Sequence, residues 1–394
     1  MSSQISKADR ALRPPLWRRP QVRAWLLQAL LLLAVIAGIA YLFDNALSNL
    51  ARQGIASGFG FWNERAGFGI GVHLIDYSES SSYGRAFLVG LLNTLLVAGL
   101  GVVLATLLGL AIGIARLSPN WLIRTWAGAY IETIRNIPLL LQIFFWYFAV
   151  LRPLPQPRAS IDLFGMIFLS NRGLYVPRPL FELGFGWLIG AVLFAVLMCA
   201  LLLRWSMRLQ AGSRRAARLG AFGVLLCLPL MALALAGAPV SWELPVLQRF
   251  NFRGGMVLTP EFVALLVALS TYTAAFIAEI VRAGIQSVGK GQQEAAYSLG
   301  LSPGLTMRKV ILPQAMRVIV PPLTNQYLNL TKNSSLAAAI AYPDLVSVFA
   351  GTVLNQTGQA VEVIGVTMAV YLAISLAIAA LMNFYNRRVA LVER

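Results

Sequence analysis

Long apolar stretches, separated by shorter polar and basic loops, are the main pattern along this chain. A helix that crosses the ~30 Å hydrocarbon core of a bilayer needs about 20 mostly apolar residues. Eight stretches are candidates, although the first, third and fourth are short or interrupted and the seventh is rich in Pro and Asn. The pattern predicts an all-α integral membrane protein with about eight transmembrane helices, at residues 26–43, 86–115, 130–151, 187–203, 219–240, 261–281, 318–341 and 361–383.

The composition excludes most other classes of protein. Of the 394 residues, 58% are apolar and only 12% are charged, whereas a soluble domain carries roughly 25% charged residues. The net charge of +17 would suit a nucleic-acid-binding protein, but such proteins combine their charge with a polar surface. Two cysteines and one histidine leave no disulfide framework and disfavour a His/Cys metal site. We expect a membrane protein with no cofactor, no metal and no nucleic-acid partner.

The basic residues predict the orientation of the chain, because Lys and Arg concentrate on the cytoplasmic side of a membrane. With both termini cytoplasmic, the inside segments hold 21 Lys and Arg residues and the outside loops hold nine. The first span follows a basic leader, but its apolar stretch of 18 residues is longer than that of a signal peptide, so we interpret it as a retained anchor. The outside loops, 44–85, 152–186 and 239–260, do not resemble a catalytic domain.

The loop between the sixth and seventh predicted spans carries the most informative motif. Residues 290–299 can form a short helix, which Gly300 would turn back toward the membrane. Ala295 and Ala296 leave a low surface that a partner could approach closely, and the Glu294 carboxylate could form an ion pair with that partner. The alternative interpretation is an ordinary polar loop between two spans.

The spacing within this loop follows Glu-Ala-Ala, three residues, Gly, nine residues, an aliphatic residue, one residue and Leu-Pro. The residues are Glu294, Ala295, Ala296, Gly300, Val310, Leu312 and Pro313. This pattern resembles the cytoplasmic signature of importer-type ABC transporter permeases, from which only Val310 departs, by replacing Ile with another β-branched residue. The resemblance implies that the loop is a coupling helix that sits in a cleft of a separate ATPase subunit, which binds the ATP.

A second set of segments narrows the resemblance. Residues 93–94, 135–142, 272–284 and 321–336 are similar to segments of permeases for polar amino acids. This likeness covers about 86–383 and implies a five-helix type I importer core plus three extra helices, as in the permeases of general L-amino-acid and of glutamate/glutamine/aspartate/asparagine importers. It also implies a periplasmic amino-acid-binding protein, ABC ATPase subunits and a second permease subunit, a copy or a relative, in the bacterial inner membrane.

These expectations divide the chain into four parts. They are a cytoplasmic N-terminus with the anchor helix (1–45), a periplasmic loop (46–85), the transporter domain (86–383) and a cytoplasmic tail (384–394). The transporter domain includes the inserted helix pair 187–240 and the coupling loop 284–313.

Polar residues at membrane depth are costly and usually face a cavity or a partner, so they are candidates for a substrate path. Residues 325, 329, 332 and 333 fall on one face of a helix, and we expect the preceding Pro-Pro pair to break its regular hydrogen bonding. Arg135 and Lys332 could each attract an α-carboxylate. Alternatively, Arg135 lies at the inner interface, and Lys332 pairs with a carboxylate or extends to the lipid headgroups. The candidate path residues are Asn93, Arg135, Asn136, Asn325, Asn329, Lys332, Asn333 and Ser334.

Several competing interpretations are weaker. Gly284 to Lys290 fits most of a phosphate-binding P-loop, but Gly291 follows where a Ser or Thr would hold Mg²⁺, so we expect no ATP site in this chain. Gly109-x-x-x-Gly113 indicates close helix packing within the chain rather than between copies. An ion-driven secondary transporter, the alternative function, would need paired broken helices in two halves of the chain. An enzyme would need clustered acids or histidines.

Overall fold

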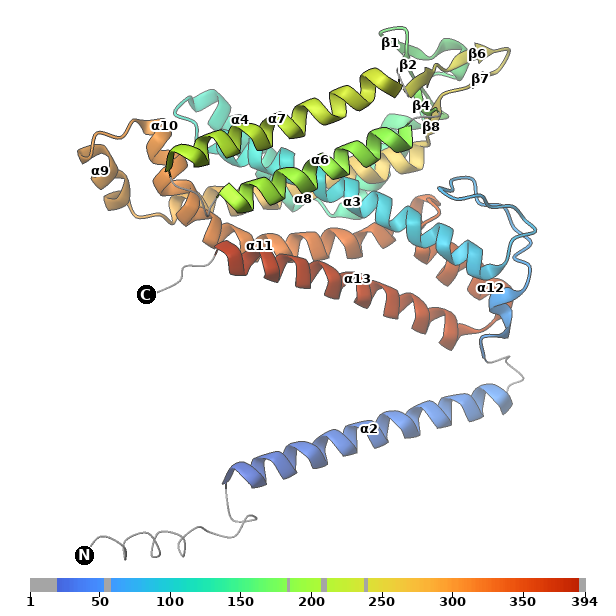
Figure 1. The fold of residues 1–394 in the computed structure, drawn as a ribbon. Helices are drawn as coiled ribbons and strands as arrows, with labels where there is room; N and C mark the ends of the chain where they lie inside the picture. The colour runs from blue at the N-terminus through green and yellow to red at the C-terminus, as the bar shows by residue number, and fades with distance from the viewer. Residues whose placement is uncertain (1–19, 53–57, 183–184, 207–210, 237–239, 390–394) are drawn as a thin grey trace, which may run out of the picture.

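The computed structural model describes residues 20–52, 58–182, 185–206, 211–236 and 240–389, and within them the protein is mostly helical (Figure 1). The basic N-terminal segment and the last five residues, which contribute to the orientation prediction, lie outside the described residues. The α-helices are α2 (Pro20–Arg52), α3 (Tyr83–Arg116), α4 (Trp121–Asn136), α5 (Leu139–Phe144), α6 (Phe185–Ser206), α7 (Ala211–Ala236), α8 (Pro260–Gln286), α9 (Lys290–Ser298), α10 (Pro303–Thr306), α11 (Leu312–Asn333), α12 (Leu354–Thr357) and α13 (Ala360–Val389). Shorter 3-10 or π turns are η2 (Gly60–Asn63), η3 (Phe145–Leu151), η4 (Pro157–Ala159), η5 (Met307–Ile311), η6 (Ser334–Ile340) and η7 (Val346–Val353).

Five helices in the described part, α2, α3, α6, α8 and α13, are long and apolar enough to cross a membrane. A sixth span results if α4 and the segment Leu139–Leu151 are counted together, but these meet at 105°. Within the described residues, the predicted count of eight is therefore not confirmed. The third predicted span is bent before Pro138, which cannot continue a helix regularly. In α7, Leu219–Ala234 is found as a shorter apolar stretch, which continues in the sequence to Val240, and α11 is rich in amides.

Helices α3 and α8 form the most extensive helix pair, and glycines let them approach closely. A Cβ atom at Gly109 would lie 2.6 Å from the Cβ of Ile277, and one at Gly113 would lie 2.8 Å from the carbonyl oxygen of Ala278. Both distances are shorter than van der Waals contact, so glycine is needed at these positions. The expectation that Gly109-x-x-x-Gly113 packs within the chain is confirmed.

Helix α11 packs on α8 and α13 and contains the two prolines that are expected to break its regular hydrogen bonding. The helix does not break at Pro321 and Pro322 but runs through them to Asn333. Neither proline has an N–H to donate, so two hydrogen bonds of the helix are lost as expected, although the fixed φ of proline lets the helix continue. Both prolines are exposed, while Val320 and Leu323 are buried against the bundle. The regular α-helix ends instead at Asn333, where the 3-10 turn η6 follows.

Short β-strands at one end of the molecule are not predicted by the sequence pattern. The strands β1, β2, β3 and β8 form an antiparallel sheet, and β4–β5 and β6–β7 form two separate pairs. We call this unit the β cap, residues 152–182 and 240–258, because it joins the segments before and after α6–α7. Its strands are β1 (Ile161–Leu163), β2 (Ile167–Ser170), β3 (Gly173–Val176), β4 (Arg178–Phe181), β5 (Val240–Glu243), β6 (Val246–Gln248), β7 (Asn251–Arg253) and β8 (Met256–Leu258).

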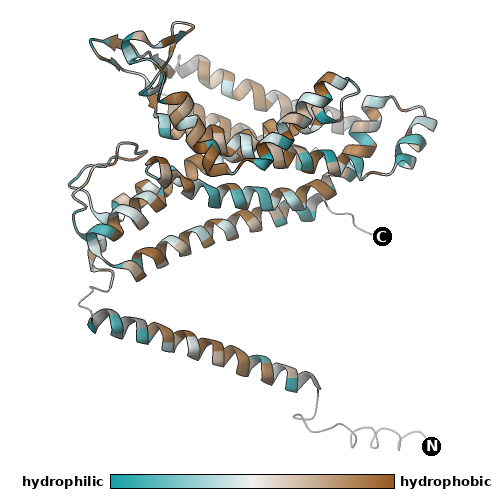
Figure 2. Ribbon diagram, turned by 180° about the vertical axis from the view of Figure 1, so that it is seen from behind, coloured by the Kyte–Doolittle hydropathy of each residue, from teal (hydrophilic) through white to brown (hydrophobic). Residues whose placement is uncertain are grey.

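Two parts of the chain stand at the edges of the bundle. Helices α6 and α7 pack mainly on each other, beginning and ending at the β cap (Figure 1). Helix α2 lies apart on the opposite side, and no residue of its apolar stretch is buried. Figure 2 shows apolar residues along the middle of α2 and polar residues toward its ends. This distribution suits a helix surrounded by lipid.

Candidate coupling segment and translocation face

The predicted coupling segment forms the helix α9, which projects from the bundle beside α10 (Figure 1). Glu294 and Ala295 are exposed, whereas Ala296 is 3% exposed and packs against the chain itself. Only one of the two alanines therefore offers the low surface that the sequence suggested. The sequence analysis missed Leu299, which is 81% exposed and lies one helical turn after the exposed Ala295.

A glycine-dependent cap ends α9 and sets its direction. Gly300 has a φ of 76°, in the left-handed region that glycine adopts at little cost. Its N–H donates to the Tyr297 carbonyl (2.9 Å), and the N–H of Leu301 donates to the Ala296 carbonyl (3.1 Å). This pair of bonds is a Schellman motif, so the predicted turn at Gly300 is present.

The chain then returns through α10 and η5 into α11. Leu312 and Pro313 form the first turn of α11, and both are exposed. The Gln314 side-chain amide donates to the Gln292 side-chain oxygen at 3.3 Å, which links the start of α11 to α9.

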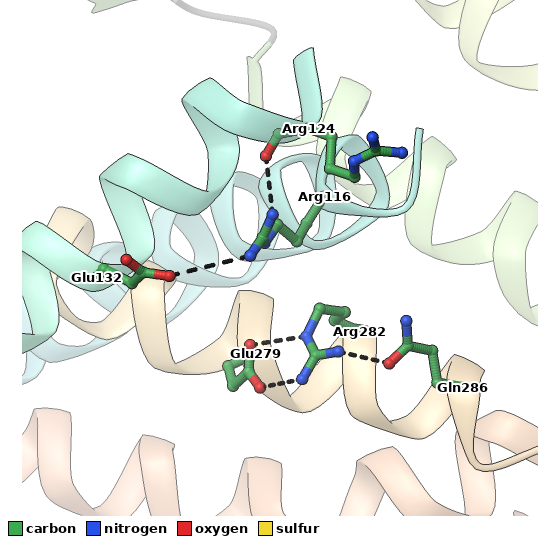
Figure 3. A network of polar contacts seen from close by, with 6 residues as sticks. All are labelled: Arg116, Arg124, Glu132, Glu279, Arg282 and Gln286. Atoms are coloured by element: carbon green, nitrogen blue, oxygen red, sulfur yellow. Dashed lines mark hydrogen bonds and ion pairs between the residues drawn. The ribbon is translucent and has the colours of Figure 1, made fainter. Parts of the chain in front are cut away.

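Charged residues form two separate groups, one that joins the end of α3 to α4 and one within α8 (Figure 3). The Arg116 guanidinium lies 3.9 Å from the Glu132 carboxylate and donates to the Arg124 carbonyl at 3.2 Å. Arg282 forms a bidentate pair with Glu279 on α8. Because the Glu132 side chain is 76% exposed, its ion pair with Arg116 contributes little to stability.

The amides of α11 form one exposed face. Asn325, Asn329 and Lys332 are exposed and follow each other at four- and three-residue spacing, whereas Asn333 is half-buried. Ser334 is buried, and its hydroxyl donates to the Thr331 carbonyl at 2.7 Å. The structure thus brings three of the five predicted α11 and η6 residues to one open surface.

The remaining path candidates lie elsewhere. Arg135 lies at the end of α4, with its guanidinium carbon 5.0 Å from the centre of the Phe276 ring, and its neighbour Asn136 is exposed. Figure 1 shows α8 between α4 and α11, and α8 contacts both. Asn93 is fully buried, and its amide donates to the carbonyl oxygens of Val72 (2.8 Å) and Pro343 (2.9 Å). It therefore joins two loops rather than facing an open path.

A buried polar group that the sequence analysis did not single out fixes η7 to the bundle. Asp344 is 1% exposed, and its carboxylate accepts hydrogen bonds from the Ser347 N–H (2.8 Å) and the Tyr371 hydroxyl (3.4 Å). The Thr94 hydroxyl accepts from the Leu345 N–H at 2.9 Å. In the sequence, Asp344 is a single acidic residue between apolar segments, and no motif marks it. Its role becomes visible only when α3, η7 and α13 are packed together.

The apparent P-loop has no phosphate-binding geometry. Gly284 lies inside α8, where the absence of a side chain lets α8 pack closely against Ile319 of α11. Among the described residues, no group of three His, Cys, Asp or Glu side chains could hold a metal ion.

Comparison with known proteins identifies the family. The family described as "Binding-protein-dependent transport system inner membrane component" matches residues 101–391. The chain belongs to this family. As an ABC transporter permease, it is a transport component of the inner membrane rather than an enzyme, and the helical architecture agrees with this assignment.

Three relatives match this permease over nearly its full length. The putative amino-acid ABC transporter permease YhdX of Escherichia coli K12 is 58% identical over 95% of this chain and 96% of its own. The general L-amino acid transport system permease AapQ of Rhizobium johnstonii is 48% identical over 95% and 94%. The glutamate/glutamine/aspartate/asparagine permease BztB of Rhodobacter capsulatus is 43% identical over 94% and 95%.

Proposed function

We propose that this permease is the membrane subunit of an ATP-driven importer of L-amino acids that depends on an external binding protein. The observation that carries the proposal is the match to three permeases named for amino-acid transport, each over at least 94% of this chain. The exposed α9, with its glycine cap and its link to α11, agrees with a segment that receives movement from another subunit.

In this mechanism, α9 sits in a cleft of a separate ATPase that binds and hydrolyses the ATP. Glu294, Ala295 and Leu299 form its exposed contact surface, with Gly300 fixing the angle of approach. Closure of the ATPase subunits would move α9, and the contact with Gln314 would pass this movement to α11. Two conformations that the nucleotide favours unequally then give alternating access.

The amide face of α11 is the proposed lining of the amino-acid path. Asn325, Asn329 and Lys332 are exposed in the single chain, and polar groups at membrane depth need a polar partner. A second permease subunit, a copy or a relative, would enclose this face. We place both termini in the cytoplasm and the β cap outside, because Lys and Arg residues are more numerous in the segments that this orientation puts inside.

The proposal is tested by purifying the complex and measuring uptake into proteoliposomes. We expect the chain to copurify with an ATPase, and uptake from a panel of radiolabelled L-amino acids to require internal-side ATP and the binding protein. Uptake that follows an imposed ion gradient without ATP would contradict the proposal and favour a secondary transporter.

The path assignment has its own test in the double variant Asn329→Ala/Lys332→Ala. We expect uptake to fall by about tenfold or more, or its substrate range to change, because two polar contacts along the path are lost. Gln326→Ala, on the same helix about 100° around its axis from Asn325, is the matched control. Normal uptake with an unchanged substrate range in the double variant would remove these residues from the path.

A further inference from the structure

Two hairpin turns of the β cap display phenylalanine side chains. Phe164, in the turn between β1 and β2, is 89% exposed, and Phe250, in the turn between β6 and β7, is 67% exposed. Each turn also contains a non-glycine residue with positive φ, Phe164 at 67° and Arg249 at 48°. Hairpin turns of this geometry normally use Asn, Asp or Gly. A large aromatic side chain at such an exposed position points to contact with another molecule.

The second turn is held rigidly against the rest of the β cap. The Arg158 guanidinium lies 4.0 Å from the centre of the Phe250 ring, and its Nε–H donates to the Arg249 carbonyl oxygen. Below the turn, the buried Phe252 ring lies 4.6 Å from the Tyr175 ring, and the Tyr175 hydroxyl donates to the Asn251 side chain at 2.7 Å. A surface ordered in advance loses little conformational entropy when it binds a partner.

The β cap is also rich in arginine, on the side of the membrane where basic residues are normally depleted. Its three acidic residues do not balance its six arginines, which are Arg152, Arg158, Arg172, Arg178, Arg249 and Arg253. The ion pairs found within the described ranges, at Glu132 and Glu279, lie elsewhere. An open hollow of about 630 Å³ is lined by Arg249, Arg253 and their neighbours in β6 and β7. Carboxylates are the natural counterpart of such a surface.

The position of the turns favours a partner in water over the lipid bilayer. Exposed aromatic residues lie in the elements where the β cap adjoins α6 and α7: Phe181 in β4, Trp187 near the start of α6 and Trp242 in β5, each at least 61% exposed. Such residues mark the level of the lipid headgroups. Figure 1 shows β6 and β7 beyond the ends of α6 and α7 and farther from these helices than β4, the strand that carries Phe181.

Given the binding-protein-dependent import proposed for this chain, we propose that the β cap is the docking surface for the external binding protein. Phe164 and Phe250 are the apolar anchors, and Arg249 and Arg253 bind carboxylates on an acidic surface of that protein. Aromatic and arginine residues of this kind carry most of the affinity in protein interfaces. The partner is thus a soluble protein with acidic residues around an apolar patch.

The test uses the complete transporter in proteoliposomes, with its own binding protein saturated with amino acid. The ATPase rate is measured against the concentration of binding protein for wild type, Phe164→Ser/Phe250→Ser and Arg249→Glu/Arg253→Glu. In both variants we expect the half-stimulating concentration to rise about tenfold or more, with an unchanged maximal rate. Added salt should raise this concentration more steeply for wild type than for the arginine variant.

Two substitutions outside the β cap are matched controls. Arg52→Glu, at the end of α2, reverses an exposed charge on the same side, and Phe59→Ser removes an exposed phenylalanine before η2. We expect both to behave as wild type. Cap variants that match these controls would overturn the docking surface and leave the importer function standing. A wild-type ATPase that the binding protein does not stimulate would instead overturn the importer function itself.

A further experiment distinguishes a β cap that binds the binding protein from one that contacts the membrane. Phe164→Cys is labelled with an environment-sensitive dye in a Cys199→Ala/Cys227→Ala background. We expect no quenching by nitroxide-labelled lipids and a change of emission when the binding protein is added. Quenching by those lipids, with no response to the binding protein, would overturn the proposal in favour of lipid contact.

Discussion

Single glycines decide how closely the central helices approach. Gly109 meets Ile277 of α8 at a distance that leaves no room for a side chain. Gly99, on the same helix, is exposed and has no atom within 4 Å of a Cβ built on it. Glycine is therefore needed for helix packing at position 109 but not at position 99. The Gly-x-x-x-Gly spacing points to the first position, but only the structure shows that the second is open.

This contrast gives a direct prediction for stability. Gly109→Leu should lower the free energy of unfolding by about 1–3 kcal/mol, because the added atoms force α3 and α8 apart. Gly99→Leu should leave stability nearly unchanged, since its side chain points to open surroundings. Thermal unfolding of the purified variants in detergent measures the difference. Equal midpoints would show that the two helices can separate without cost.

Asp344 matters as a hydrogen-bond acceptor, so its amide and aliphatic replacements should differ. Asp344→Asn keeps an oxygen for the Ser347 N–H, and we expect thermal stability close to wild type. Asp344→Leu leaves that partly buried N–H without its acceptor, which costs about 1–3 kcal/mol. Thermal unfolding of both variants in detergent provides the comparison. Similar losses in both would assign the role to charge or shape instead.

The elements that the sequence predicts well are those with long or specific patterns. The spans at α3, α8 and α13 agree with long apolar runs, and the turn at Gly300 agrees with a glycine after a short polar helix. The β cap could not be predicted because its strands are only three or four residues long. Asn93 was a reasonable path candidate as a polar residue in a span, but only the folded chain shows its bonds to Val72 and Pro343.

The coupling element depends on backbone conformation at one residue. In Gly300→Asp, a residue with a Cβ must adopt a φ of 76°, so the end of α9 should shift, and ATP hydrolysis should continue with uptake reduced by about tenfold or more. Gly300→Asn is the matched variant, because asparagine tolerates this conformation better, and it should keep most uptake. The ratio of ATP hydrolysed to amino acid imported measures coupling. An unchanged ratio in Gly300→Asp would exclude this residue from the coupling segment.

At the scale of the whole molecule, the α6–α7 pair behaves as an insertion into the β cap. Strands β4 and β5, which flank it, are paired antiparallel, with Phe181 opposite Val240. Helices α6 and α7 pack mainly on each other. Because the two ends of the insertion meet at paired residues, a two-residue turn can replace it without disturbing the sheet.

Replacing residues 182–239 by Asn-Gly should therefore leave the bundle and the β cap intact. We expect the unfolding midpoint to stay within about 4 °C of wild type and stimulation by the binding protein to persist, because neither α9 nor the hairpin turns lie in the deleted segment. Replacing 181–239 in the same way shifts the β4–β5 register by one residue and exchanges the two faces of the pair. That matched variant should lose binding-protein stimulation. Equal behaviour of the two deletions would mean that the β4–β5 pairing does not organise the β cap, and failure of both to fold would place α6–α7 within the structural core.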